Sequence, residues 1–224
     1  RRWRGGAMFA MLCLLATPLA VGAAQPGAVG TAPADKAAAA STAGSTTALA
    51  AASTAGPAGP ASADACPPLL DRSFARLQDE TQLDLCRFAG KVLLVVNTAS
   101  YCGFTKQYQG LEALYARYAD RGLVVLGFPS NDFKQEASSN REIAELCFDT
   151  YGVKFPMFVP SQVTGTGANP LYADLARITG QQPAWNFHKY LVARDGRTVT
   201  GFPSKVGPLD RKLLAEIEAS LDAR

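Results

Sequence analysis

The sequence predicts an α/β domain in which helices flank one central mixed β-sheet. Two observations carry this prediction. Strand and helix signals alternate along the first part of the domain, and a hairpin followed by a helix closes it. Alternation favours parallel strands joined by helical crossovers, whereas a hairpin adds antiparallel strands, so the sheet is expected to be mixed.

The first elements follow from apolar patterning. The run KVLLVV predicts a buried strand over 91–97. Apolar and aromatic residues then recur at helical spacing over 106–120, and Gly122 offers a stop for that helix. Similar signals predict a strand over 123–128, a helix over 140–147, a strand over 156–159 and a helix over 170–179.

Local signals fix several boundaries near the C-terminus. The pair Asn169-Pro170 is typical of an N-cap and a first helical residue, and Gly180 lies where that helix should end. The pair Asp195-Gly196 is a strong turn signal between strands predicted over 189–193 and 198–202. The last helix carries an apolar stripe made of Leu213, Leu214, Ile217 and Leu221.

Cys102 lies between the strand over 91–97 and the helix over 106–120. A helix N-terminus carries partial positive charge, which favours the nucleophilic thiolate over the thiol. Redox proteins with a Cys-x-x-Cys motif keep their dithiol at such a turn, but here the position three residues after Cys102 is Thr105. The turn therefore predicts one activated thiol, and the alternative is a small buried cysteine without chemistry.

Three blocks of the sequence resemble the signature blocks of the glutathione peroxidase family. They are NTASYCGFT over 97–105, GFPSNDFKQE over 127–136 and AWNFHKYLV over 184–192, and the resemblance covers roughly residues 69–221. It agrees with the strand and helix order in implying a thioredoxin-like fold in a single domain. It also implies a thiol peroxidase that reduces hydrogen peroxide or organic hydroperoxides.

The resemblance implies that Gln135, Trp185 and Asn186 surround the catalytic Cys102. Gln135 and Asn186 carry amide donors, and the indole N–H of Trp185 can only donate. Donors directed at sulfur favour its anionic form, and they can also hold the leaving peroxide oxygen. The loop before Gln135 is one position shorter than is common in the family and has lost a glycine, which can shift the amide of Gln135.

Cys147 lies where thioredoxin-dependent members of the family hold a resolving cysteine, although one residue early in register. The implied cycle oxidises Cys102 to a sulfenic acid, which condenses with Cys147 into a disulfide. A thioredoxin-like dithiol, or glutathione, would then restore both thiols. An inert helix-face cysteine is the alternative for Cys147.

Two alternative functions remain for the whole protein. One is a disulfide carrier with a thioredoxin fold, acting on secreted proteins, and the other is a non-catalytic binding module.

Cys66 and Cys86 precede the strand over 91–97 and lie 20 positions apart. In an oxidising compartment such a pair predicts a structural disulfide that closes the hairpin between them. The alternative is that one of them resolves the oxidised Cys102.

Two N-terminal segments are expected outside the domain. Residues 1–24 combine a basic start, an uncharged apolar stretch and small residues before Gln25, which is the pattern of a signal peptide. Residues 25–64 are mostly Ala, Ser, Thr, Gly and Pro and are predicted to be disordered. The peroxidase domain is thus expected over 65–224, in a secreted or periplasmic protein. It would have no stable membrane insertion after cleavage, and would be tethered to the membrane if the signal were retained.

Composition argues against several other classes of protein. The net charge of the sequence is +3. Three arginines in the first four residues contribute a charge of +3, so the domain itself is close to neutral. Without a basic stripe, nucleic-acid binding has no support. His188 is the single histidine, predicted to lie at the surface or behind the site, and neither a metal nor another cofactor is expected. Tetrameric members of the family carry an insertion where this chain has only the short link 180–184, so a monomer is expected.

Overall fold

The computed structural model describes residues 66–223. The predicted signal segment 1–24 and the predicted disordered segment 25–64 therefore lie outside the described residues. No helix within 66–223 is long and apolar enough to cross a membrane.

A four-stranded mixed sheet forms the centre of the described part, in the order β4-β3-β5-β6. β3 (Val92–Thr98) pairs in parallel with β4 (Leu123–Pro129) and antiparallel with β5 (Lys189–Val192). β5 pairs antiparallel with β6 (Val199–Phe202). The prediction of a mixed sheet built from a parallel pair and a C-terminal hairpin is thus confirmed.

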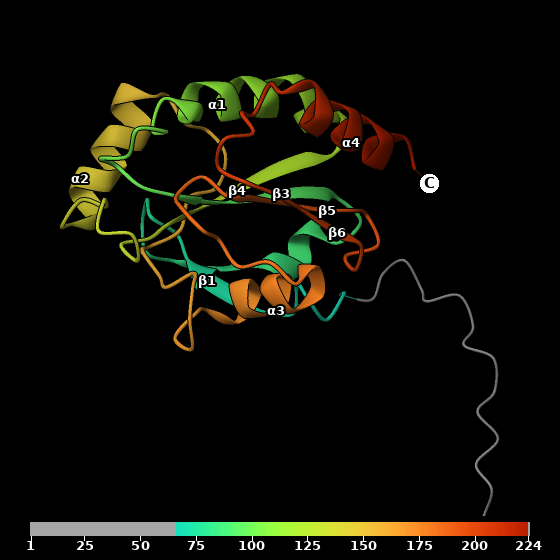
Figure 1. The fold of residues 1–224 in the computed structure, drawn as a ribbon, viewed down its shortest axis with the longest axis horizontal. Coiled ribbons are helices and arrows are strands. Elements are labelled where there is room, and N and C mark those ends of the chain that lie inside the picture. Colours follow the sequence, from blue (N-terminus) through green and yellow to red (C-terminus); the bar gives the residue numbers. More distant parts are fainter. Residues whose placement is uncertain (1–65, 224) are drawn as a thin grey trace, which may run out of the picture. The chain divides into compact units, whose positions relative to one another are not determined.

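Helices cover both faces of this sheet (Figure 1). α1 (Gln107–Tyr118) and α4 (Arg211–Asp222) lie over one face. α3 (Pro170–Thr179) lies over the other. Helices on both faces of a mixed sheet of this order form the predicted thioredoxin-like arrangement.

β3 shows how the sequence builds the two layers of the core. All 7 residues of this strand are buried, because it lies between two neighbours and beneath helices on both faces. Successive side chains point to opposite faces of a strand. Val92, Leu94 and Val96 join the apolar cluster of α1 and α4, whereas Leu93 and Val95 join that of α3. Each such side chain contributes about 1.5–3 kcal/mol by leaving water.

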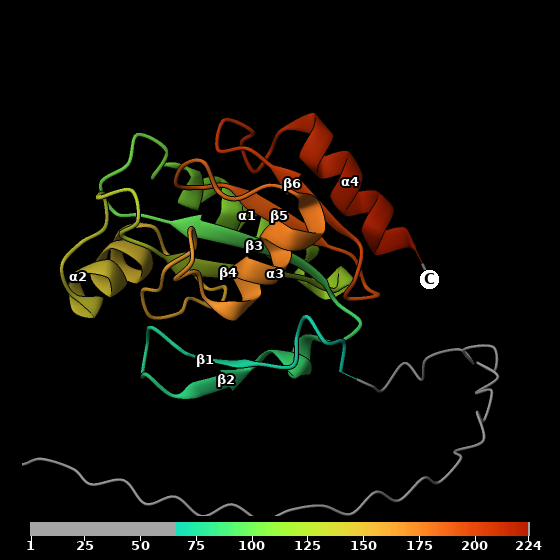
Figure 2. The same cartoon turned by 60° about the horizontal axis from the view of Figure 1, so that its bottom comes forward.

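A separate antiparallel hairpin precedes the sheet (Figure 2). It consists of β1 (Ser73–Ala75) and β2 (Gln82–Asp84) and leads into the 3₁₀ helix η1 (Leu85–Phe88). A disulfide between Cys66 and Cys86, whose Cα atoms are 5.2 Å apart, joins the segment before β1 to η1. The predicted closure of this hairpin by a disulfide is therefore present.

The predicted helix boundaries rest on residues that the structure uses as caps. The Asn169 side chain accepts a hydrogen bond from the backbone N–H of Tyr172 and so caps α3. Gly180 ends that helix with φ +67°. α1 continues into the 3₁₀ helix η2 (Ala119–Arg121), and Gly122 follows it with φ +101°. These left-handed positions favour glycine, which has no Cβ to clash.

The strand predicted over 156–159 is wrong. This segment forms only two isolated bridges, one at Met157 and one at Phe158. The physical reason is that proline has no N–H to donate to a ladder, and Pro156 and Pro160 stand at either end of the segment.

The helix predicted over 140–147 changes its geometry halfway. α2 (Asn140–Ala144) is followed by a π-helix, η3 (Glu145–Thr150). The Ser139 hydroxyl accepts from the backbone N–H of Glu142 at 3.3 Å, as an N-cap should. Cys147 lies within η3, and π-helical turns occur frequently at functional sites.

Replacing both Cys66 and Cys86 with Ser should lower the free energy of unfolding by about 3 kcal/mol, because the disulfide no longer restricts the unfolded chain. Urea unfolding of the wild type and the double variant measures this difference. Reduction by dithiothreitol is the control. It should lower the unfolding midpoint of the wild type to that of the variant and leave the midpoint of the variant unchanged. Equal unfolding midpoints under oxidising conditions would contradict the structural role of this disulfide.

Candidate active site

Cys102 lies on the turn between β3 and α1, and its side chain is 8% exposed. The backbone N–H of Phe104 donates to its sulfur, with the nitrogen 3.4 Å away. The Thr105 hydroxyl accepts from the N–H of Cys102 at 3.0 Å and donates to the carbonyl of Ala99 at 2.9 Å. Thr105 stands where a Cys-x-x-Cys motif has its second cysteine. It therefore stabilises the turn through its hydroxyl and not through a disulfide.

The loop between β4 and α2 lies against this turn. The N–H of Tyr101 donates to the carbonyl of Gln135 at 2.8 Å. One carboxylate oxygen of buried Glu136 accepts from the N–H groups of Ser100 and Ala137, at 2.9 and 2.8 Å, and from the Ser100 hydroxyl. Burial raises the pKa of Glu136, and these hydrogen bonds offset part of the increase. Glu136 therefore joins the cysteine turn to the loop that carries Gln135.

The shortened loop is closed by a tight turn that places Lys134 at φ +58°. The Lys134 N–H donates to the carbonyl of Asn131 at 3.0 Å. A lysine in this left-handed conformation costs about 1–2 kcal/mol, which a glycine would avoid. The turn leaves the Gln135 side chain in reach of Asn186, whose amide nitrogen donates to its oxygen at 3.0 Å. The missing residue therefore does not separate Gln135 from Asn186.

Trp185 and Asn186 lie on a turn just before β5, which we call the 185–187 turn. Trp185 is 40% exposed, and its ring centroid lies 5.3 Å from that of Phe133. Asn186 is fully buried. Asn97, in β3, holds this turn twice: its carbonyl accepts from the N–H of Phe187 at 2.6 Å, and its side chain donates to the carbonyl of Trp185 at 3.1 Å. The central strand therefore sets the position of both predicted site residues.

Gln135 connects the three segments that the sequence predicts as the site. Its carbonyl contacts the residue before Cys102, and its side chain contacts Asn186. The donors differ from those expected, because Asn186 donates to Gln135 and the N–H at the sulfur belongs to Phe104. Among residues 66–223, no hydrogen bond joins the side chains of Gln135, Trp185 or Asn186 to the sulfur.

Two features of the site suit a small ligand. The Oδ1 atom of Asn186 is buried and has no hydrogen-bond partner within the described part of the chain. A bound molecule can donate to a buried acceptor that no protein group satisfies. Across 66–223, neither the indole N–H of Trp185 nor the amide nitrogen of Gln135 donates to another residue, so both donors are open to such a molecule.

Cys147 is fully buried on η3. Burial raises the pKa of its thiol from the ordinary 9.0 to about 12; hydrogen bonding with Tyr108 opposes the increase, and the charge of Glu136 adds to it. The ring of Tyr108 also packs edge-on against Phe187, with centroids 5.4 Å apart. Cys102 and Cys147 belong to the same apolar cluster and are the two free cysteines of the described chain.

Sequence reasoning missed several residues that build the site. Glu136 is part of the block over 127–136 but has no predicted role, and Asn97 and Lys189 are predicted only as strand residues. A polar residue at the end of an apolar strand, such as Asn97, is a usable signal, because it needs a partner once buried. His188 is also buried rather than at the surface, and burial, together with the charge of Lys189, lowers its pKa to about 4.

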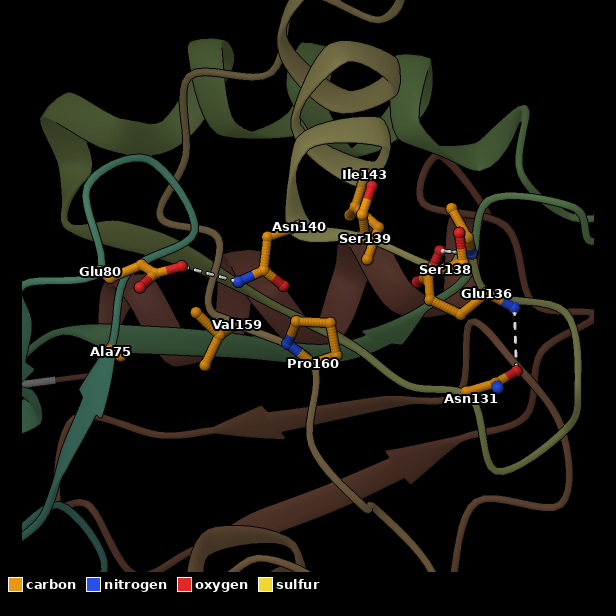
Figure 3. Close-up of a pocket in the computed structure, with 11 residues that line it drawn as sticks. Ala75, Glu80, Asn131, Glu136, Ser138, Ser139, Asn140, Ile143, Val159 and Pro160 are labelled. Atoms are coloured by element: carbon orange, nitrogen blue, oxygen red, sulfur yellow. Dashed lines mark hydrogen bonds between the residues drawn. The ribbon is translucent and has the colours of Figure 1, made fainter.

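Two open pockets border these segments. One, of about 600 Å³, is lined by Asn131 and Glu136 and by Glu80 and Asn140, whose side chains hydrogen-bond at 2.9 Å (Figure 3). None of the four predicted site residues lines it. The other, of about 470 Å³, is lined by Gly103 and further residues that follow the cysteine. The second pocket is therefore the one adjoining the turn that carries Cys102.

One group of close metal-ligand atoms occurs among the described residues, formed by Cys66, Asp71 and Cys86. The disulfide occupies two of its three members. This group is therefore not a metal site while the disulfide is intact.

Comparison with known proteins places this chain among peroxidases. The family model described as glutathione peroxidase matches residues 71–176. Hydroperoxy fatty acid reductase gpx1 of Synechocystis sp. is 44% identical over 158 residues, which cover 66% of this chain and 92% of that protein. Thioredoxin/glutathione peroxidase BtuE of Escherichia coli is 41% identical over 160 residues, covering 60% of this chain and 87% of that protein.

A solved structure supports the same assignment. The crystal structure of Trgpx in its apo form has 32% sequence identity and a TM-score of 0.57, and the match covers 71% of this chain and 98% of that chain. The fold, the cysteine turn and the relatives agree: the chain belongs to the glutathione peroxidase family.

Proposed function

We propose that this protein is a thiol peroxidase that reduces hydrogen peroxide or organic hydroperoxides through Cys102. The observation that carries the proposal is that three segments meet at one place, because Gln135 is hydrogen-bonded both to the cysteine turn and to Asn186. The names of the relatives support it, since one is a reductase of hydroperoxy fatty acids and the other a thioredoxin/glutathione peroxidase.

In the first step the Cys102 thiolate attacks the terminal oxygen of the hydroperoxide. A sulfur–oxygen bond forms and the oxygen–oxygen bond breaks, which leaves a sulfenic acid and an alkoxide or hydroxide that takes up a proton. The Phe104 N–H stabilises negative charge on the sulfur. The open N–H groups of Gln135 and Trp185 can hold the leaving oxygen, and a hydroperoxide can donate to the unpartnered oxygen of Asn186.

In the second step Cys147 condenses with the sulfenic acid, forming a disulfide and releasing water. A buried thiol with a pKa of about 12 is a poor nucleophile at neutral pH, so η3 must open before Cys147 reacts. Ile143 and Cys147 are the only buried residues in 140–150. Leu146 and Phe148 of this segment also pack partly buried against the core, so its opening costs at least about 3 kcal/mol.

A dithiol protein of the thioredoxin type is the reductant that we propose, because thiol–disulfide exchange restores both thiols of an internal disulfide. Glutathione is the alternative. The Cys66–Cys86 disulfide favours an oxidising compartment, in agreement with a secretory signal over 1–24. The short link 180–184 favours a monomer.

Replacing Cys102 with Ser should abolish peroxide consumption, because Cys147, the other free thiol among residues 66–223, is fully buried. Replacing Cys147 with Ser should permit one oxidation of Cys102 per molecule and then stop turnover. Stopped-flow consumption of hydrogen peroxide with a thioredoxin system measures both.

The variant lacking both Cys66 and Cys86 is the control for that experiment and should turn over normally. Equal peroxide reactivity in the wild type and Cys102→Ser would falsify the proposal. Disulfide transfer to a reduced protein without any preference for peroxide would point to the disulfide carrier instead.

Alkylation of Cys147 should be strongly suppressed in the folded protein and should increase with pH, because only the thiolate reacts. In Cys102→Ser at pH 8, iodoacetamide should label Cys147 about 10² to 10³ times more slowly than in guanidinium chloride. If η3 stays closed, the pKa increase from 9.0 to about 12 gives the larger factor. If labelling occurs through opening of η3, the cost of opening gives the smaller factor. Mass spectrometry of the Cys147 peptide measures the rate, and similar rates in both states would refute the buried thiol.

A further inference from the structure

The 185–187 turn contains a residue in an unusual backbone conformation. Phe187 has φ +64°, in the left-handed region that bulky side chains rarely adopt. Its ring is fully buried and packs against Tyr108. Such a conformation persists only where the surroundings hold it in place, and it clusters at functional sites.

Three hydrogen bonds hold this turn from two strands. From β3, Asn97 accepts the N–H of Phe187 at 2.6 Å and donates to the carbonyl of Trp185 at 3.1 Å. From β5, the ammonium of Lys189 donates to the carbonyl of Phe187 at 2.7 Å. The peptide groups before and after Phe187 are thus both fixed, and Asn186 lies between the fixed points.

Lys189 is an expensive residue for this position. Its side chain is fully buried, and no salt bridge among the described residues includes it. Burial lowers the pKa of Lys189 to about 7, which reflects the unfavourable environment of its charge. An apolar side chain of the same length would avoid this desolvation. Stability alone therefore does not explain a lysine here.

We propose that Lys189 is a positioning residue for the peroxidase reaction. By holding the Phe187 carbonyl it keeps the 185–187 turn in its left-handed form, and so keeps the Asn186 amide on Gln135 and the Trp185 ring against Phe133. This inference rests on the proposed function. Without the ammonium, Phe187 can relax toward an ordinary backbone conformation, which turns Asn186 away from Gln135.

Lys189→Met tests the proposal, because it removes the donor and keeps the length of the side chain. Oxidation of Cys102 by hydrogen peroxide, followed in single-turnover stopped flow, should be slower by at least about tenfold. The urea midpoint should stay the same or rise, because a buried charge is lost. Trp3 is the second tryptophan of the sequence and is replaced with Phe so that only Trp185 emits. Without peroxide, the emission of Trp185 should then shift to longer wavelength, as the indole becomes more exposed.

Leu175→Ala, on α3 at the opposite face of the sheet, is the control for lost stability. It should lower the urea midpoint and leave the rate of Cys102 oxidation unchanged. Should Lys189→Met fail to fold, Lys189→Gln takes its place, since its amide is too short to reach the Phe187 carbonyl and should give the same rate loss.

Wild-type rates in the Lys189 variant would overturn the inference, and so would a rate loss shared with Leu175→Ala. Absence of Cys102 oxidation in the wild type would instead refute the proposed function. The shift in Trp185 emission needs no peroxide, so it tests the positioning role even in that case.

Discussion

The buried carboxylate of Glu136 is the contact on which the rest of the site depends. It accepts from the backbone of Ser100 and Ala137 and thereby holds the cysteine turn against the loop of Gln135. Burial disfavours its charge and raises its pKa, and the hydrogen bonds recover part of that cost. Removing the carboxylate would leave two buried N–H groups unpaired, each at about 1–3 kcal/mol. Through Gln135 the same contact extends to Asn186.

Burial divides the roles of the two free cysteines. Cys102 is slightly exposed and receives the N–H of Phe104, so it can meet a peroxide directly. Cys147 is fully buried, with a pKa raised to about 12, so it stays protonated until its helix opens. This difference in burial supports the order of steps that we propose, in which Cys147 reacts second, after a local rearrangement exposes its thiol.

Local chemistry explains how much of the fold could be predicted. β3 and α3 appear as expected, because the signals that predict them depend only on neighbouring residues. These signals are the apolar run of β3 and the caps of α3 at Asn169 and Gly180. The strand predicted over 156–159 does not form. Its apolar residues are buried, but between the flanking prolines the segment makes only isolated bridges. Periodicity alone does not distinguish these two ways of burying the same residues.

The sequence predicts which segments meet at the site, but neither the N–H group that donates to the Cys102 sulfur nor the residues that hold these segments together. The positions of Cys102, Gln135, Trp185 and Asn186 were assigned from the sequence blocks, and the structure joins their segments through Gln135. The left-handed conformations of Lys134 and Phe187 could not be foreseen, because neither residue type favours them and both depend on distant partners. For the same reason the hydrogen bonds from Asn97 and Lys189 became visible only in three dimensions.

Peptide mapping by mass spectrometry after one equivalent of hydrogen peroxide tests the central claim most directly, namely that Cys102 is oxidised and Cys147 resolves it. The account predicts a Cys102–Cys147 disulfide with the Cys66–Cys86 linkage unchanged. A disulfide joining Cys102 to Cys66 or Cys86, or oxidised Cys147 beside an intact Cys102 thiol, would contradict it.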